Sequence, residues 1–312
     1  MQGGNQRNEM ESYKYLAKNI GFLTISQFGT KILAFFLVPL YTNILTTGEY
    51  GLYDLFNATV GFLIPVLTLN ISSSVLRYTL EKESDRKAVF TISCKYLFVS
   101  NFCLVIFLTG NHLYPVFTII DSYRFYFFLM FFSQTLSEIV SNFARGLEKI
   151  CEVAVSSVVA SAVLFLLNIV LIVVLRMGLT GYFIANIASA LAQSMYLLIR
   201  MRCWSFFERA LKSDAIERKM LNYSRPMIAN SIAWWTNNAA DKYIVLIICG
   251  MEANGIYSVA SKIPSLLNIF QTIFNQAWSL SAIKDFDSAD RNGFFSKMYN
   301  SYNCLMSVVC AG

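Results

Sequence analysis

The chain has 312 residues, of which 56% are hydrophobic, 15% aromatic and only 14% charged, and its formal net charge is +6. This composition is too apolar and too poor in charge for the surface of a soluble globular protein, so soluble enzymes are excluded. The apolar residues form blocks of about 20 or more, the length of helix that crosses about 30 Å of hydrocarbon. Since only a helical bundle satisfies the backbone of such segments in lipid, the sequence predicts an all-α polytopic membrane protein.

Nine membrane segments are predicted, with short polar turns between them. They are Ile20 to Leu45, Gly51 to Leu76, Val89 to Thr109, Tyr123 to Phe143, Val153 to Leu175, Leu179 to Ile199, Ser224 to Cys249, Ala253 to Ile283, and Met298 onward. Pro39 and Pro65 lie inside the first two segments. We expect each proline to bend or break its helix locally, which membrane helices tolerate where neighbours satisfy the freed carbonyls.

The basic residues fall almost entirely on one side of this arrangement. Of the 25 Lys and Arg residues, 19 lie in loops of one side, while only Arg124 and Arg176 lie in loops of the other. Because loops rich in Lys and Arg stay in the cytoplasm, the N-terminus is predicted to be cytoplasmic. The basic residues are spread over five separate loops, so we interpret the positive charge as topology and contact with the lipid bilayer, and we expect no nucleic acid partner.

A short motif occurs twice. Gly51-Leu52-Tyr53 follows the first apolar segment, and Gly255-Ile256-Tyr257 occurs in the same setting 204 residues later. Between the sixth and seventh segments, an interval of mixed aromatic and charged residues predicts an amphipathic helix on the cytoplasmic leaflet. We therefore predict a first six-helix lobe over residues 1–200, an amphipathic linker over 201–222, and the first part of a second lobe, of about three helices, over 223–312.

The two lobes are expected to be parallel repeats, because an even number of helices brings both into the membrane from the same side. The ninth segment crosses only about half of the bilayer before the last residue at helical rise. The expectation is therefore a truncated second lobe.

Neither cysteines nor histidines predict a reactive centre. The seven cysteines are scattered without a Cys-x-x-Cys pair, and His112 is the only histidine. Scattered cysteines in apolar blocks are typical of small packing residues. The sequence thus predicts no catalytic group, no metal site and no cofactor.

Several stretches resemble a known family. The runs are AKNIGFLTISQFGTKILAFFLVPLYTNILTTGEYGLYDL, RPMIANSIAWWTNNAADKYIV, NGIYSVASKI and FNQAWSLSAIKDF. They are similar to polysaccharide and O-antigen flippases (Wzx-type polysaccharide transporters) of the multidrug/oligosaccharidyl-lipid/polysaccharide exporter superfamily. The resemblance implies two helical lobes of the MATE/MurJ-like type around a central cavity.

The resemblance also implies a function. Such a protein flips a polyprenyl-diphosphate-linked oligosaccharide, an O-antigen or capsule repeat unit, across the bacterial inner membrane by alternating access. It is a transporter and not an enzyme, and its implied partners are the lipid-linked oligosaccharide, the bilayer and other polysaccharide-assembly proteins.

Charged residues at membrane depth need a partner, a watery cavity or a function. For Lys95 and Glu138, near the cytoplasmic ends of their segments, we expect structural ion pairs or snorkelling. Asp54 lies close to the outer surface, where it is expected to cap or solvate a helix end. Asp241 and Lys262 reach similar depths and are a possible pair, with a functional and a structural role both open.

The predicted substrate-binding residues are Lys31, Lys262, Asp241, Lys242, Gln27 and Asn237. Lys31 lies about 16 Å deep, near the midplane, where an unpaired ammonium suits a diphosphate; burial as neutral lysine, or a carboxylate partner outside this sequence, is the alternative. Gln27 adds a polar position beside it. Lys242 points about 100° away from Asp241, so the two neighbours are expected to have separate roles.

An aromatic and amide group on the seventh segment is the last candidate. Asn237 and its neighbours Trp234, Trp235 and Asn238 suit a sugar path, although aromatic residues in membrane helices also serve as packing and interface anchors.

Two other functions stay open. A cation-coupled multidrug exporter of the same superfamily would need acidic cavity residues, whereas the candidates near the midplane are mainly basic. A membrane glycosyltransferase or polymerase would need a sizeable catalytic domain and convergent carboxylates, and the predicted outer loops are short.

Overall fold

The computed structural model of the chain describes residues 37, 43–81, 85–114, 118–207, 214–261, 300, 303, 304 and 307. The chain divides into two units, Met1–Ala260 and Ser261–Gly312. All the helices discussed below belong to the first unit. Most of the first predicted segment, the part of the eighth beyond Ser261 and nearly all of the ninth lie outside the described residues.

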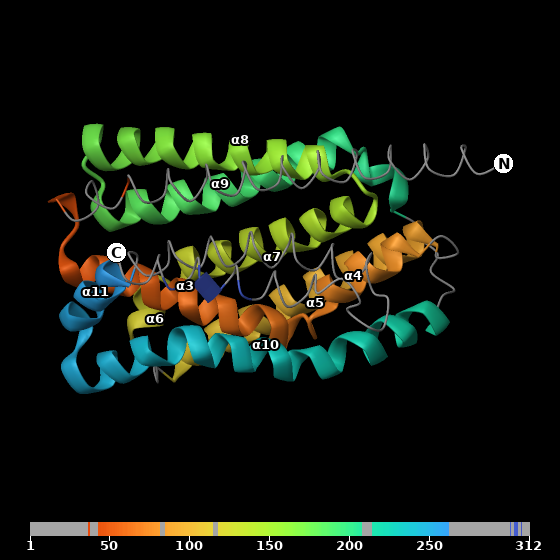
Figure 1. Cartoon of the computed structure of the whole chain (residues 1–312). Coiled ribbons are helices and arrows are strands. Elements are labelled where there is room, and N and C mark those ends of the chain that lie inside the picture. The colour runs from red at the N-terminus through yellow and green to blue at the C-terminus, as the bar shows by residue number, and fades with distance from the viewer. Residues whose placement is uncertain are drawn as a thin grey trace. The chain divides into compact units, whose positions relative to one another are not determined.

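All regular structure in the described part of the chain is helical (Figure 1). The elements are α3 (Thr47–Leu67), α4 (Ile71–Leu80), α5 (Arg86–Leu113), α6 (Thr118–Ser122), α7 (Arg124–Gly146), α8 (Ile150–Asn168), the π-helix η1 (Ile169–Val174), α9 (Gly178–Arg200), the 3₁₀-helix η2 (Cys203–Phe206), α10 (Asp214–Cys249) and α11 (Met251–Ala260). The third to sixth predicted segments correspond to α5, α7, α8 with η1, and α9. The prediction of an all-α fold is therefore confirmed.

The second predicted segment is two helices instead of one. Helix α3 contains Pro65 in its last turn and ends at Leu67, and α4 starts at Ile71. Leu69 and Asn70 between them have left-handed φ values of 54° and 52°. Because proline cannot donate a backbone hydrogen bond and left-handed residues end a helix, the chain turns here. The expected break near Pro65 is thus observed a few residues beyond it.

The interval predicted as a separate amphipathic linker differs from the expectation. Helix α10 already starts at Asp214 and continues for 36 residues to Cys249. Its first turns lie against α4, where the Ser74 hydroxyl donates to the Met220 carbonyl at 2.6 Å and Met220 is fully buried. Phe206 and Ile216 of this interval also pack against the core, whereas Trp204 and Phe207 are exposed. The division into lobes at these boundaries stays a prediction.

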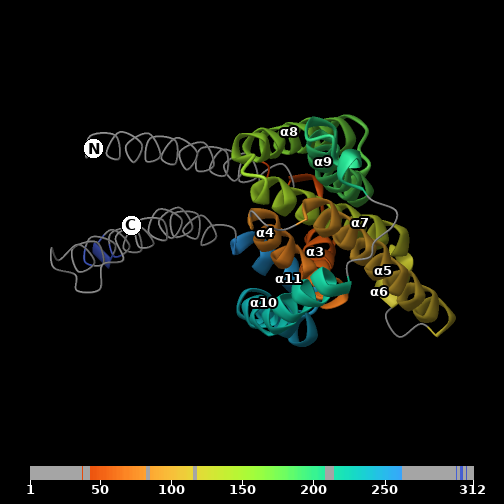
Figure 2. The same cartoon turned by 90° about the vertical axis from the view of Figure 1, so that its right-hand side faces the viewer.

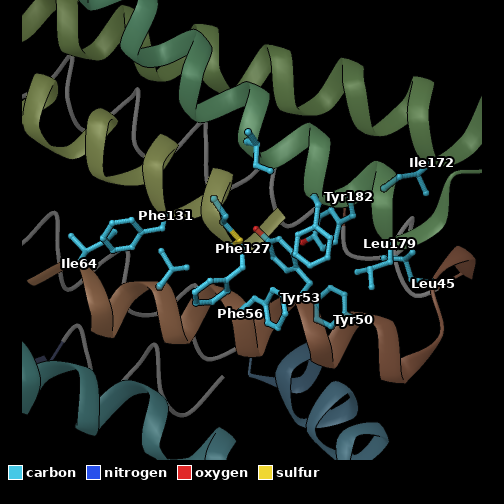
Figure 3. Close-up of a cluster of buried hydrophobic side chains, with 14 of the residues drawn as sticks. Leu45, Tyr50, Tyr53, Phe56, Ile64, Phe127, Phe131, Ile172, Leu179 and Tyr182 are labelled. Carbon is cyan, nitrogen blue, oxygen red and sulfur yellow. The ribbon is translucent and has the colours of Figure 1, made fainter. Parts of the chain in front are cut away.

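Helix α3 lies in the middle of the described bundle, with α7 on one side and α10 and α11 on the other (Figure 2). The core between α3, α7 and α9 is mainly aromatic (Figure 3). The rings of Phe56 and Phe127 meet edge to face at 5.2 Å, and Tyr53 packs on Tyr182 at 4.1 Å. Each such pair contributes about 0.5–1.5 kcal/mol beyond burial. This core fixes the position of α3, on which the candidate site is built.

Four of the described helices are long and apolar enough to cross a membrane: α3, α5, α8 together with η1, and α9. Helices α5, α8 and α10 also expose large apolar side chains, among them Phe98, Phe102, Val158, Leu166, Ile247 and Ile248. Side chains of this kind are stable on an outer surface only when lipid covers it. Helix α7 has a similar length but carries a polar face.

Candidate functional site at the contact of α3, α10 and α11

Helices α3 and α11 approach each other closely at two glycines. A methyl group added at Gly51 would lie 2.7 Å from the Met251 carbonyl oxygen and 2.9 Å from the Gly255 nitrogen. One added at Gly255 would collide with the Thr47 carbonyl. The Asn254 side-chain amide donates to the Gly51 carbonyl at 3.3 Å. Only glycine lets two helix backbones approach this closely, so both positions of the repeated motif serve the same contact.

The contact is reciprocal. Gly51 and Gly255 are 204 residues apart, as are Thr47 and Met251. Gly51 faces Gly255 and the Met251 carbonyl, while Gly255 faces Gly51 and the Thr47 carbonyl. When equivalent positions of two repeats contact each other in this way, the repeats are related by a two-fold axis at the contact. The repeat offset read from the sequence and the contact in space therefore agree.

A buried ion pair lies one turn further along the same contact. Asp54 of α3 is only 3% exposed and pairs with the Lys242 ammonium of α10 at 2.5 Å. The Ser258 hydroxyl of α11 donates to the same carboxylate at 2.7 Å. Ser258 is the repeat counterpart of Asp54, again 204 residues away. Three helices are thus joined at one carboxylate.

The expectation that Asp54 merely caps or solvates a helix end was wrong. The residue is near the end of the bundle, but α10 and α11 cover it, and Lys242 supplies the charge that a buried carboxylate requires. Sequence depth alone did not reveal this, because the two covering helices come from the far end of the chain. The 204-residue offset, applied to Asp54, would have found Ser258.

Above the ion pair, α10 is fastened to α3 by aromatic residues. The Trp235 indole donates to the Ala58 carbonyl at 2.7 Å and packs on Phe62. The Thr59 hydroxyl donates to the backbone of its own helix and therefore accepts from the Tyr243 hydroxyl at 2.7 Å. For Trp235, the packing interpretation holds, whereas the adjacent Trp234 is 64% exposed.

These observations can be compared with known proteins. The family model for polysaccharide biosynthesis proteins matches residues 16–279, which is most of the chain. The chain belongs to the polysaccharide biosynthesis protein family. A search of curated proteins found no match.

Solved structures show the fold of this polysaccharide biosynthesis protein. It is similar to an outward-facing multidrug resistance MATE family transporter of the MOP superfamily, with 15% identity and a TM-score of 0.59 over 81% of this chain and 61% of that chain. A MOP superfamily transporter from Pyrococcus furiosus, described as having a binding pocket of reverse polarity, gives 14% identity and a TM-score of 0.56, with the same coverage. At these identities the likeness shows the fold. The chain spans about 61% of the length of these two transporters.

The predicted site residues of this family member divide into two groups. Lys31, Gln27 and Lys262 lie outside the described residues, so the proposed Asp241–Lys262 pair stays a prediction. On α10, Asp241 is exposed and accepts from the Tyr257 hydroxyl at 3.1 Å, while Lys242 turns to Asp54. These neighbours thus have different partners, as their angular separation predicts, and their roles in substrate binding stay predictions. Asn237 is exposed on the same helix.

Lys95 and Glu138, toward the opposite ends of the helices from the Asp54–Lys242 pair, have structural partners. Lys95 donates to both carboxylate oxygens of Glu217 at 2.7 and 2.9 Å, and the Tyr96 hydroxyl donates to the same group. Burial raises the pKa of the Glu217 carboxyl, but these hydrogen bonds outweigh it and hold that pKa below its usual value. Glu138 accepts from the Ser72 hydroxyl at 2.6 Å. The expected structural ion pair is thus observed for Lys95.

Proposed function

We propose that this protein moves a polyprenyl-diphosphate-linked oligosaccharide across the bacterial inner membrane by alternating access. The family match and the MOP-type fold support transport of a polysaccharide precursor. The observation that carries the mechanism is the reciprocal contact of α3 with α11, closed by the ion pair of Asp54 with Lys242. Two-fold-related helices that meet at one end are the elements that separate when two repeats rock against each other.

The chemistry of the contact suits a gate that opens and closes. At Gly51 and Gly255 backbone meets backbone, and the side chains that cross the contact, Asn254 and Ser258, are held by single hydrogen bonds. The helices can therefore part by breaking a few polar contacts. Asp54 and Lys242 need each other only while they are buried, since water stabilises both charges once the helices separate. In the predicted orientation the described basic loops face the cytoplasm, and the contact lies at the outer end. We therefore assign the contact to the outer gate in its closed state.

Opening of the gate would expose Lys242 to the substrate path. In the closed contact its ammonium is bound to Asp54, so it is not available to a diphosphate. We assign first contact with the diphosphate to Lys31 and Lys262, with Gln27 beside Lys31, and we assign Lys242 to the open gate. Asp241 and Asn237 lie on the exposed face of α10 and complete the proposed set.

Leaflet-resolved measurement of lipid-linked sugar tests the function. In a strain that lacks the full-length protein, we expect polyprenyl-linked oligosaccharide to accumulate on the cytoplasmic leaflet and surface glycan to be lost, and the full-length protein should restore both. A multidrug exporter would change dye efflux and leave the leaflet distribution normal. A polymerase would change glycan length after crossing. Either result would contradict the proposal.

A variant at the midplane tests the cation. Lys31→Ala in the full-length protein should abolish surface-glycan assembly, because the diphosphate would lose its point-charge partner. Lys31→Arg should retain part of the activity, since it keeps the charge. Normal assembly by Lys31→Ala at normal expression would remove Lys31 from the proposed site.

A further inference from the structure

A polar face runs along α7. Its members are spaced so that they share one face of the helix: Gln134, Ser137, Glu138, Ser141, Asn142 and Arg145. Together with Ala190 and Gln193 of α9 they line a cavity of about 370 Å³. That volume lies in the range of small-molecule sites, about 300–1,000 Å³. Polar residues in a membrane helix are costly without a role, so the cavity calls for an explanation.

Part of the cavity wall is held rigid by its own hydrogen bonds. The Ser137 hydroxyl donates to the Gln193 side-chain oxygen at 2.9 Å, which ties α7 to α9. The Gln134 amide donates to the Asn57 side chain of α3 at 3.1 Å. These bonds fix the orientation of two glutamines before any ligand arrives. A preformed wall of this kind lowers the ordering cost of binding.

The rest of the wall has hydrogen-bonding capacity that the described residues leave unused. The Ser141 hydroxyl is buried, with 9% of the residue exposed, and has no partner among them. The side chains of Asn142 and Arg145 make no hydrogen bond within the same part of the chain, although Arg145 interacts electrostatically with Glu138. Glu138 uses one carboxylate oxygen for Ser72. A buried hydroxyl without a partner costs about 1–3 kcal/mol. The unused groups therefore point to a polar occupant.

The types of group select the chemistry of that occupant. A carboxylate accepts, a guanidinium donates, and a hydroxyl and an amide do both, all within about two turns of one helix. A sugar, whose hydroxyls donate and accept in turn, matches this mixture. A diphosphate does not, because Glu138 offsets the charge of Arg145 and the described lining has no net positive charge. A hydrophobic cation finds no aromatic side chain among the described lining residues.

We propose that the α7–α9 cavity binds the sugar units of the transported glycan, separately from the cations assigned to the diphosphate. This inference rests on the proposed function for the source of the glycan. It divides the head group between two places: hydroxyl-rich sugars at the polar face of α7, and phosphates at the lysines. Ser141 and Asn142 are specificity-determining residues in this arrangement.

The test uses the full-length protein in nanodiscs and the free oligosaccharide released from the lipid by mild acid. We expect the free oligosaccharide to bind, and Ser141→Ala and Asn142→Ala each to weaken binding about five- to tenfold, the effect of one lost hydrogen bond. Inorganic pyrophosphate should not compete. Thr135→Val is the matched control: Thr135 also has a buried hydroxyl without a partner among the described residues, on a part of α7 that does not line the cavity.

The outcomes are separable. If the wild-type protein restores the leaflet distribution but the Ser141 and Asn142 variants bind the oligosaccharide as tightly as wild type, the sugar site is wrong and the proposed function stands. If Thr135→Val weakens binding equally, the loss reflects helix packing and the assignment is overturned. If the protein neither binds the oligosaccharide nor restores the distribution, both proposals fail. Equal unfolding midpoints of the variants show that a loss of binding is not a loss of fold.

Discussion

The environment of Asp54 is formed by residues that lie far from it in the sequence. Its carboxylate is buried, and its partners are an ammonium from α10 and a hydroxyl from α11. Removing one member of a buried pair leaves the other charge without compensation, which costs about 3–5 kcal/mol. Replacing both members leaves no charge behind. The pair is therefore strongly coupled in the closed contact.

This coupling predicts the result of a double-mutant cycle. Lys242→Met alone should lower the stability of the purified full-length protein by about 3–5 kcal/mol, whereas Asp54→Asn combined with Lys242→Met should recover most of that loss. Thermal unfolding of the two single variants and the double variant measures the coupling. Strict additivity would show that the two charges do not depend on each other. Asp241→Asn serves as the control, because its carboxylate is exposed and accepts only one described hydrogen bond.

At the scale of the helix, the glycines of α3 are unequal although they occur close together. A side chain at Gly51 would meet the backbone of α11 at 2.7 Å, while a methyl at Gly48 would meet nothing within 4 Å. Helix propensity alone favours alanine over glycine by up to about 1 kcal/mol at both positions. Propensity and sterics therefore act in opposite directions at Gly51 and not at Gly48.

The expected outcome is a contrast between two equal substitutions. Gly51→Ala should prevent closure of the α3–α11 contact and abolish surface-glycan assembly, and Gly48→Ala should leave it intact. Spin labels on exposed positions of α3 and α11 in the full-length protein measure the separation directly. An unchanged distance distribution for Gly51→Ala would exclude the close approach as a requirement for closure.

The helices also show what the sequence can predict. Apolar length located α5, α7, α8 with η1, and α9, because each coincides with one long, mainly apolar block of the sequence. Pro65 indicated a local break in the second segment, but neither hydropathy nor the position of the proline located the left-handed turn at Leu69 and Asn70. Helical geometry correctly placed Asp241 and Lys242 on different sides of α10. The partner of Lys242 could not be read, because it depends on how two repeats dock.

At the scale of the whole molecule, the distribution of basic residues implies an orientation. Helices α5, α8 and α10 begin at the end of the bundle rich in Lys and Arg (Figure 1). Helices α3, α9 and α11 begin at the opposite end, where α10 ends. Cysteines happen to mark both ends. Cys151 is exposed at the start of α8, and Cys249 is exposed at the end of α10.

Thiol labelling can therefore test the orientation. In intact cells, a membrane-impermeant maleimide should label a variant of the full-length protein that keeps only Cys249, and should spare one that keeps only Cys151 until the membrane is permeabilised. A variant with only Cys203 should stay unlabelled in both cases. In the natural chain the pKa of the Cys203 thiol is raised to about 12, mainly by burial. Burial persists when the other cysteines are replaced, so the thiol stays neutral at pH 7 as well as inaccessible. The reverse pattern for Cys151 and Cys249 would place the N-terminus outside.

The ion pair at the gate also has a consequence in time. Lys242 is synthesised 188 residues after Asp54. At about 5–20 residues per second, α3 enters the membrane about 10 to 40 s before α10 can neutralise its carboxylate. The first repeat must therefore insert with an uncompensated acid near one end of α3, where water can still reach it. Arrival of α10 then completes the burial of Asp54, so the charges that the proposed gate separates are also the ones that join α3 to α10 during biogenesis.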